Sequence, residues 1–179
     1  MEILKFVLMG LAIMVFLLII IPIFTKKKLR VERDIIINKP IGQVFGFVKI
    51  LKNQDHFSVW AQKDPEMLKE YRGIDGTVGF VSGWDSKMKD VGKGEQEIKK
   101  IADGKRIDYE LRFIKPFAAT NYADIVFTSL SETQTKVSWG FAGEMKYPMN
   151  LLLLLRDMDS LLGKDLQEGL ANLKELLEK

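Results

Sequence analysis

The sequence predicts an α+β protein, in which a curved, seven-stranded antiparallel sheet wraps around one long C-terminal helix, with a single transmembrane helix in front. Three observations predict this arrangement. Residues 6–24 form an uncharged apolar run, residues 67–147 alternate between apolar and polar side chains in short segments, and residues 151–177 carry leucine at helical spacing.

The apolar run begins at Phe6 and ends at Phe24, so it holds nineteen residues without a charge. As a helix it would span about 28 Å, close to the hydrocarbon thickness of a bilayer. A basic flank follows at once, made of Lys26, Lys27, Lys28 and Arg30. We therefore expect residues 1–28 to be a membrane anchor and residues 29–179 to form one globular domain.

A cleavable signal peptide is the alternative, because Lys5 supplies a positive charge before the run. The run is longer than a usual signal core, and residues 22–26 offer no pair of small residues for a signal peptidase. An uncleaved anchor is therefore favoured. One basic residue before the span against four after it predicts a single-pass protein of the cell membrane with its C-terminal domain facing the cytoplasm. The basic cluster fits a stop-transfer flank, or alternatively a contact with anionic lipid headgroups.

Charge and composition exclude several classes of function. Residues 1–28 contain Glu2 against four lysines, which leaves 23 basic and 23 acidic residues for the rest of the 27 and 24 in the chain. A neutral domain without a basic stripe argues against a nucleic-acid partner. The absence of cysteine excludes disulfides, thiol catalysis and thiolate metal sites.

The N-terminal part of the domain combines one strand with helical segments. Val31 to Ile37 reads as a strand, and Pro40 then begins a helix that we expect to reach about Lys52. A second short helical turn over residues 53–61 should present Phe57 and Trp60 to the interior. These helical segments would lie on the same side of the sheet as the long C-terminal helix.

Six further strands follow, because five groups of turn residues divide residues 67–147: they are 75–76, 86–90, 103–104, 115–116 and 131–133. Period-two alternation in these strands predicts one wet face and one covered face. A single amphipathic helix starting after Pro148 should provide the cover, with Gly163 and Gly169 permitting a bend or a close approach.

Several local motifs resemble one known superfamily. They are Pro40-Ile41-Gly42-Gln43-Val44-Phe45, Val91-Gly92-Lys93-Gly94-Glu95, Leu111-Arg112-Phe113 leading to Lys115-Pro116-Phe117, and the segment from Met158-Asp159 to Leu173-Lys174. In their order and spacing they resemble the SRPBCC superfamily, the START-related and birch-pollen-allergen-like helix-grip proteins, and in particular its polyketide-cyclase-like bacterial branch. The resemblance implies a cavity for a hydrophobic ligand between sheet and terminal helix. It transfers no catalytic residue.

We predict the ligand-binding residues from the inward register of the strands and from the two helical segments. They are Trp60, Phe80, Ser82, Trp84, Gln96, Tyr109, Leu111, Phe113, Asn121, Phe127, Trp139, Phe141, Leu154, Met158 and Leu161. Large apolar walls with few polar groups are typical of small-molecule pockets, although the same residues also suit a filled core. Ser82, Gln96 and Asn121 share this register and would either orient a ligand oxygen or be satisfied by water or neighbouring backbone, and the second alternative is favoured.

The expected partners are a hydrophobic small molecule or lipid and the membrane, with no cofactor and no metal. His56 is the single histidine, so no histidine cluster is possible, and a surface position in a connecting segment is favoured for it. Two alternatives stay open. One is a cyclase or hydrolase that uses His56 or an inward polar group, and the other is an interaction protein whose pocket is filled by its own side chains.

Overall fold

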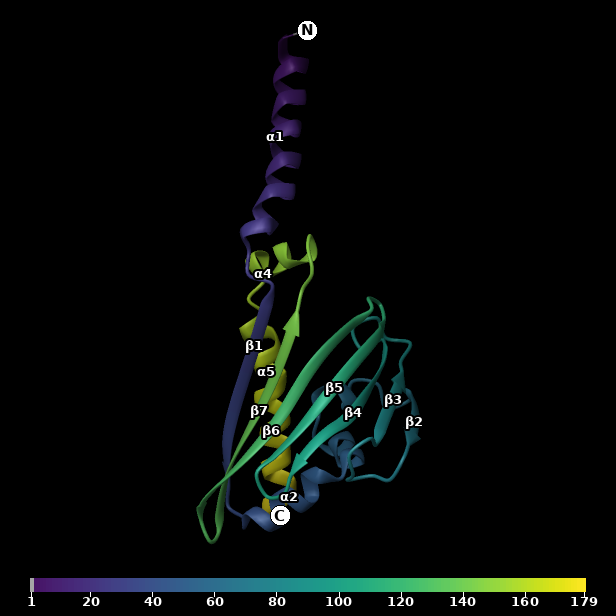
Figure 1. The fold of residues 1–179 in the computed structure, drawn as a ribbon, viewed down its shortest axis with the longest axis vertical. Helices are drawn as coiled ribbons and strands as arrows, with labels where there is room; N and C mark the ends of the chain where they lie inside the picture. The colour runs from purple at the N-terminus through teal and green to yellow at the C-terminus, as the bar shows by residue number, and fades with distance from the viewer. Residues whose placement is uncertain (1) are drawn as a thin grey trace.

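In the computed structural model, which describes residues 2–179, one antiparallel sheet curves around a C-terminal helix, and an apolar helix projects from one end (Figure 1). The seven strands follow the order β1-β7-β6-β5-β4-β3-β2, so the sheet is open, with β1 and β2 at its edges. Their bounds are Lys28–Ile37 for β1, Leu68–Arg72 for β2, Val81–Asp85 for β3, Lys93–Ala102 for β4, Arg106–Lys115 for β5, Ala119–Ser131 for β6 and Gln134–Glu144 for β7.

The six strands predicted after residue 67 are all present, and each predicted turn lies between two of them. Gly76 and Gly104 have φ angles of 75° and 66°, which glycine adopts without a steric cost. The first strand is longer than the predicted Val31–Ile37, because it pairs with β7 from Lys28 opposite Glu144 onward. Only residues 25–27 therefore separate the apolar helix from the sheet.

Three short helical segments follow β1: α2 (Ile41–Lys49), the 3-10 helix η1 (Leu51–His56) and α3 (Val59–Gln62). The expected continuation of the first helix to Lys52 is wrong. Ile50 adopts an extended conformation with φ −76° and ψ 105°, and the Leu51 amide donates to the Asp75 carboxylate at 2.7 Å. A side chain in the β2–β3 connection thus ends this helix and begins the next turn.

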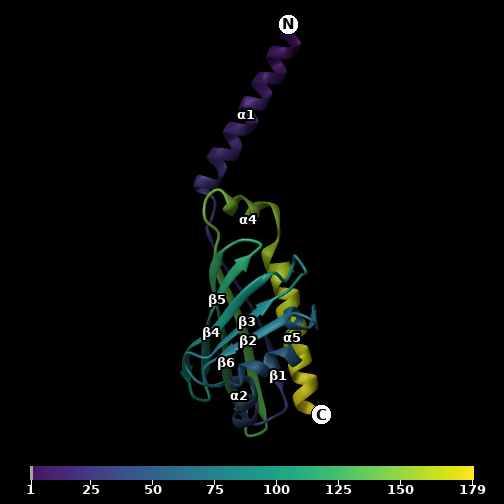
Figure 2. The same cartoon turned by 90° about the vertical axis from the view of Figure 1, so that its right-hand side faces the viewer.

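The single C-terminal helix expected after Pro148 is interrupted. The chain forms the 3-10 helix η2 (Met149–Leu151), the short helix α4 (Leu152–Leu155) and then α5 (Met158–Glu178). Arg156 is extended, and the Asp157 side chain caps α5 by accepting a hydrogen bond from the Ser160 amide at 3.1 Å. Figures 1 and 2 show α4 directly below the apolar helix, while α5 runs along the sheet toward the opposite end of the molecule.

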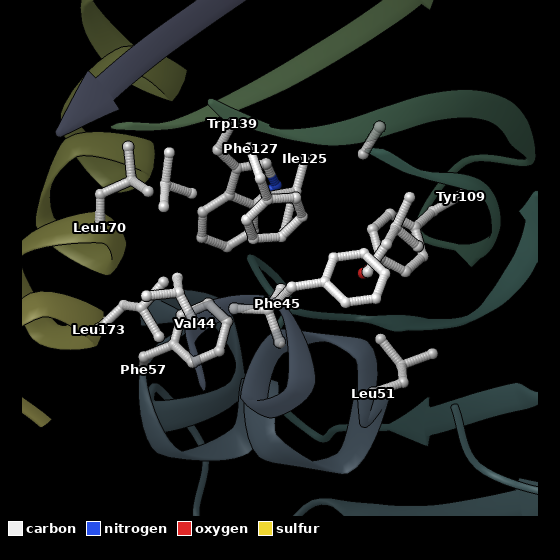
Figure 3. Close-up of a cluster of buried hydrophobic side chains, with 14 of the residues drawn as sticks. Val44, Phe45, Leu51, Phe57, Tyr109, Ile125, Phe127, Trp139, Leu170 and Leu173 are labelled. Atoms are coloured by element: carbon white, nitrogen blue, oxygen red, sulfur yellow. The ribbon is translucent and has the colours of Figure 1, made fainter. Parts of the chain in front are cut away.

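The core lies between the sheet, α2 and α5, and Figure 3 shows side chains from all three meeting there. Phe45 of α2 packs edge-on against Phe127 of β6 at 5.2 Å between ring centroids. Gly169 is buried in α5, where an added Cβ would lie 2.9 Å from the Trp139 ring. This glycine therefore permits the close approach of α5 to β7, which is one of the two roles predicted for it.

The apolar helix α1 (Glu2–Phe24) contacts the domain only near its C-terminal end. Its length and composition suffice to cross a membrane, and most of its side chains face away from the protein. Near its last turn, the Asn150 side-chain amide donates to the carbonyls of Pro22 at 2.6 Å and Thr25 at 3.2 Å. The Tyr147 hydroxyl donates to the Ile19 carbonyl at 3.3 Å. The segment after β7 thus holds the end of α1.

Candidate functional site

A cavity of about 300 Å³ lies between the helix-facing side of the sheet, the η1–α3 region and the middle of α5. Six neighbouring strands, β2 to β7, contribute its wall, and Leu162 and Leu166 of α5 close it from the other side. Its lining residues are Leu51, Gln54, Asp55, Ser58, Trp60, Ala61, Met67, Lys69, Ser82, Trp84, Asp90, Val91, Gln96, Leu111, Phe113, Ala123, Trp139, Phe141, Leu162 and Leu166.

Aromatic rings that contact one another form much of the wall. Trp139 meets Trp60 edge-on at 6.2 Å between centroids and Phe57 at 5.7 Å. Across the cavity wall, Trp84 of β3 meets Phe113 of β5 at 5.8 Å, again edge to face. Gly94 belongs to β4, the strand between β3 and β5, and an added Cβ there would lie 2.6 Å from the Trp84 ring. The glycine at position 94 thus leaves room for the Trp84 ring beside the paired strands β3 and β4.

A few polar groups interrupt the apolar wall. The buried Gln54 side chain lines the cavity, and its Nε2 atom has no hydrogen-bond partner. Ser82 and Gln96 lie on paired positions of β3 and β4, and Ser58 adds a further hydroxyl. Because a buried amide without a partner is costly, Gln54 is a donor available to a ligand oxygen.

A charged pair lies at the same cavity. Lys69 of β2 donates to the Asp55 carboxylate at 2.9 Å, and the Tyr71 hydroxyl donates to its other oxygen at 3.0 Å. Burial, together with this hydrogen bond to Asp55, raises the pKa of Tyr71 to about 12, so the hydroxyl stays protonated as a donor. Asp55 is thereby satisfied on both oxygens by protein groups.

Tyr109 lies in the core and is 1 % exposed. Burial raises the pKa of its hydroxyl far above the ordinary range, although the nearby Gln54 amide opposes the shift. Neither the hydroxyl nor the Gln54 Nε2 atom reaches a partner with hydrogen-bond geometry. Two neutral, unpartnered polar groups therefore lie close together, with Gln54 lining the cavity and Tyr109 in the packed core next to it.

The sequence matches the family model described as polyketide cyclase / dehydrase and lipid transport over residues 28–178. The chain belongs to this family. It is part of the SRPBCC superfamily, and the helix-grip fold expected from the sequence is confirmed by solved structures. No curated protein matches the sequence.

Three solved structures illustrate the fold that this chain shares with other proteins. Norcoclaurine synthase from Thalictrum flavum, solved in complex with dopamine and hydroxybenzaldehyde, has 10% identity and a TM-score of 0.64, covering 89% of this chain and 92% of its own. A protein from Thermus thermophilus has 18% identity and a TM-score of 0.59, with 84% and 97% covered. Ara h 8.0201 has 12% identity and a TM-score of 0.58, with 84% and 98% covered. At these identities the likeness concerns the fold.

The structure brings eight of the fifteen predicted ligand-binding residues to the cavity between the sheet and α5. They are Trp60, Ser82, Trp84, Gln96, Leu111, Phe113, Trp139 and Phe141. Phe80, Tyr109 and Phe127 lie in the packed core instead, and Asn121 packs against Gly143. Contact of any of these residues with a ligand stays a prediction.

The three C-terminal residues predicted for the site lie elsewhere. Leu161 is half exposed, while Leu154 and Met158 line a second hollow beside the end of α1. Leucine recurs at helical spacing on both sides of the break at Arg156 and Asp157, so the pattern alone did not reveal that the stripe changes direction. The His56 side chain is exposed and does not line the cavity, in agreement with the surface position predicted for it.

Sequence reasoning missed several lining residues. Gln54 and Asp55 lie in a 3-10 helix too short to show a period, and Ser58 lies just before α3. Met67 immediately precedes the edge strand β2, and Lys69 is its second residue. Ala123 shares the inward register of β6 and was detectable by that signal, but its side chain is small. Within residues 2–179, no three histidine, cysteine or acidic side chains group in a way that suits a metal ion.

Proposed function

We propose that this family member is a membrane-tethered binding module that takes up a hydrophobic small molecule of lipid, isoprenoid or polyketide type. The observation that carries the proposal is the cavity between sheet and α5, whose aromatic and aliphatic wall is interrupted by few polar groups. Ligand pockets are typically built in this way. The unpartnered Gln54 amide would bind a carbonyl or hydroxyl oxygen of the ligand.

Two comparisons support this class of ligand. The family description includes lipid transport, and a protein of the same fold was solved with two small aromatic molecules, dopamine and hydroxybenzaldehyde. Trp60, Trp84 and Trp139 offer ring faces and edges to a flat or branched apolar compound.

The tether is supported by α1. Its 23 residues would extend about 35 Å as a helix, enough to cross the hydrocarbon layer. The basic residues after it favour a cytoplasmic domain, and the three-residue connection keeps this domain at the bilayer surface. Ligand exchange would then take place beside the membrane.

The test is to extract the full chain from membranes in mild detergent and to identify bound compounds by native mass spectrometry and solvent extraction. We expect a co-purifying apolar compound that is lost in Ala123→Leu, because Ala123 lines the cavity and a larger side chain fills it. Ala119→Leu is the matched control, since Ala119 lies on the same strand, is exposed and does not line the cavity. An empty protein that also fails to bind fluorescent hydrophobes would contradict the proposal.

The same experiment addresses the two alternatives. A cyclase-like enzyme would release a compound that differs in mass or ring count from the one supplied. An interaction protein with a filled pocket would retain no compound and would instead co-purify with a membrane protein. In both cases Ala123→Leu would distinguish use of the cavity from use of the surface.

A further inference from the structure

A second hollow lies at the other end of the domain, where α1 meets the sheet. We call it the junction notch: it is bounded by the last turn of α1, the free edge of β1 and residues 153–159, and its volume is about 910 Å³. Its lining residues are Ile20, Ile21, Phe24, Thr25, Lys26, Lys28, Leu29, Arg30, Val31, Leu153, Leu154, Arg156, Asp157, Met158 and Asp159. None of them belongs to the cavity described above.

The lining combines an apolar part with a basic rim. The apolar part comes from three elements, with Phe24 of α1 85% exposed and Leu154 of α4 61% exposed. Exposed apolar side chains grouped around a hollow mark a binding surface more strongly than scattered ones do. The remaining lining includes four basic and two acidic side chains.

The charges in the notch fall into two groups. Asp157 caps α5 through Ser160, Asp159 is paired with Arg33 at 2.8 Å, and Arg30 is paired with Asp124 at 2.9 Å. Lys26, Lys28 and Arg156, in contrast, form no ion pair with any of residues 2–179. Three exposed cations therefore remain available beside an apolar surface.

We propose that the junction notch binds one anionic phospholipid of the bilayer. Its acyl chain would lie against Phe24 and Leu154, and its phosphate would contact Lys26, Lys28 and Arg156. This inference rests on the proposed membrane tether, because only then does the last turn of α1 lie at the boundary between hydrocarbon and headgroups. At that depth an apolar surface next to cations matches the two parts of the lipid.

The test compares two charge-matched pairs of substitutions in the full chain. Lys26→Gln with Lys28→Gln changes the notch, whereas Lys27→Gln with Lys146→Gln removes two exposed, unpaired charges nearby that do not line it. Each protein is reconstituted in bilayers of phosphatidylcholine with a minority of phosphatidylglycerol, released in mild detergent, and analysed by native mass spectrometry. We expect the first pair to lower retained phosphatidylglycerol about tenfold and the second to change it little.

A second comparison tests the apolar part. Leu154→Ser should lower retention, whereas Leu155→Ser should not, because Leu155 is 70% exposed yet does not line the notch. Inorganic phosphate should not displace the lipid, since it lacks an acyl chain. Equal losses within either matched pair would show diffuse attraction to the membrane and would overturn the site, as would a protein that retains no phosphatidylglycerol.

Alkaline carbonate extraction of the same membranes separates the two proposals. A chain that leaves the membrane under carbonate contradicts the tether and, with it, the notch. A chain that stays in the membrane but shows no dependence on Lys26 and Lys28 contradicts the notch alone.

Discussion

The side-chain amide of Asn150 donates a 2.6 Å hydrogen bond to the backbone carbonyl of Pro22, which joins the end of α1 to the segment after β7. Asn150 is fully buried, and the same amide also reaches the Thr25 carbonyl. The carbonyls of the last helical turn lack partners within the helix, so this side chain supplies what the helix itself does not. The first prediction concerns this contact.

Asn150→Leu should loosen the junction between α1 and the domain and lower the free energy of unfolding by about 1–3 kcal/mol, because the Pro22 and Thr25 carbonyls lose the donor that Asn150 supplies. Tyr147→Phe is the milder comparison, since it removes one 3.3 Å bond from a half-exposed hydroxyl. The chain has no cysteine, so spin labels on two introduced cysteines, one in α1 and one in β7, can measure the distance distribution. An unchanged width in Asn150→Leu would show that the contact does not position the helix.

The second prediction concerns Arg30 of β1, which reaches across β7 to Asp124 of β6. Gly140 lies between them, and an added Cβ there would be 2.7 Å from the guanidinium and 2.9 Å from the carboxylate. Asp124→Asn should lower the free energy of unfolding by about 1.5–3 kcal/mol, because its carboxylate is buried and accepts charged hydrogen bonds.

Asp34→Asn provides the control for Asp124→Asn. It removes the 3.2 Å pair with Lys136, in which both side chains are well exposed, and should cost less than about 1 kcal/mol. Urea unfolding of the full chain in detergent measures both. Equal effects of the two substitutions would contradict a special role for the buried carboxylate.

Much of the fold was predictable, because alternation over a long strand reports its covered face directly. Tyr109 of β5 is predicted to point inward on this ground, and it is buried. Alternation does not reveal, however, whether an inward side chain fills the core or lines a cavity. Tyr109 and Trp139 both point inward, yet only Trp139 borders the cavity, because whether a side chain fills or lines a space depends on its neighbours from distant segments.

The C-terminal region shows a second limit of sequence patterns. Leu154 and Leu166 belong to one continuous leucine spacing, but Leu166 is buried in the core while Leu154 is exposed beside α1. The break between them depends on Asp157 capping α5, a local signal that the longer periodicity hides. Helical spacing therefore identified apolar faces without identifying what covers them.

The third prediction tests the packing of Trp84. In Gly94→Ala the new methyl group would lie 2.6 Å from the Trp84 ring and 2.8 Å from the Arg112 backbone carbonyl, so both the indole and the backbone of β5 must shift. We expect a shift in tryptophan fluorescence and a loss of the retained apolar compound. Gly46→Ala, whose added Cβ meets nothing within 4 Å, should change neither.

The fourth prediction concerns how the stability contributed by Glu95 changes at acidic pH. Hydrogen bonds from Arg72, and then from Arg112, hold the pKa of Glu95 below its ordinary value of 4.5, against the opposing effect of burial. A depressed pKa in the folded protein contributes stability above pH 4.5, and this contribution is lost as the pH falls through the depressed value. Arg72→Met should therefore lower the melting temperature at neutral pH and have less effect well below pH 4.5.

Glu95→Gln serves as the control for the acid experiment. With the carboxylate removed, the substitution Arg72→Met should show a weaker dependence on pH, apart from the residual contribution of Glu70. Thermal unfolding followed by circular dichroism in detergent measures all four proteins. A pH-independent difference between wild type and Arg72→Met would show that the pair does not hold the pKa of Glu95 down.

Residues 25–27, the short connection between α1 and β1, extend at most about 10 Å even when fully stretched. Asn150 holds the other side of the junction through its two hydrogen bonds, so α1 is joined to the domain at two places. In the tethered arrangement proposed above, a change in the tilt of α1, such as one imposed by a thicker or thinner bilayer, would be passed on to the domain. Bilayer thickness would then influence the direction in which the domain faces.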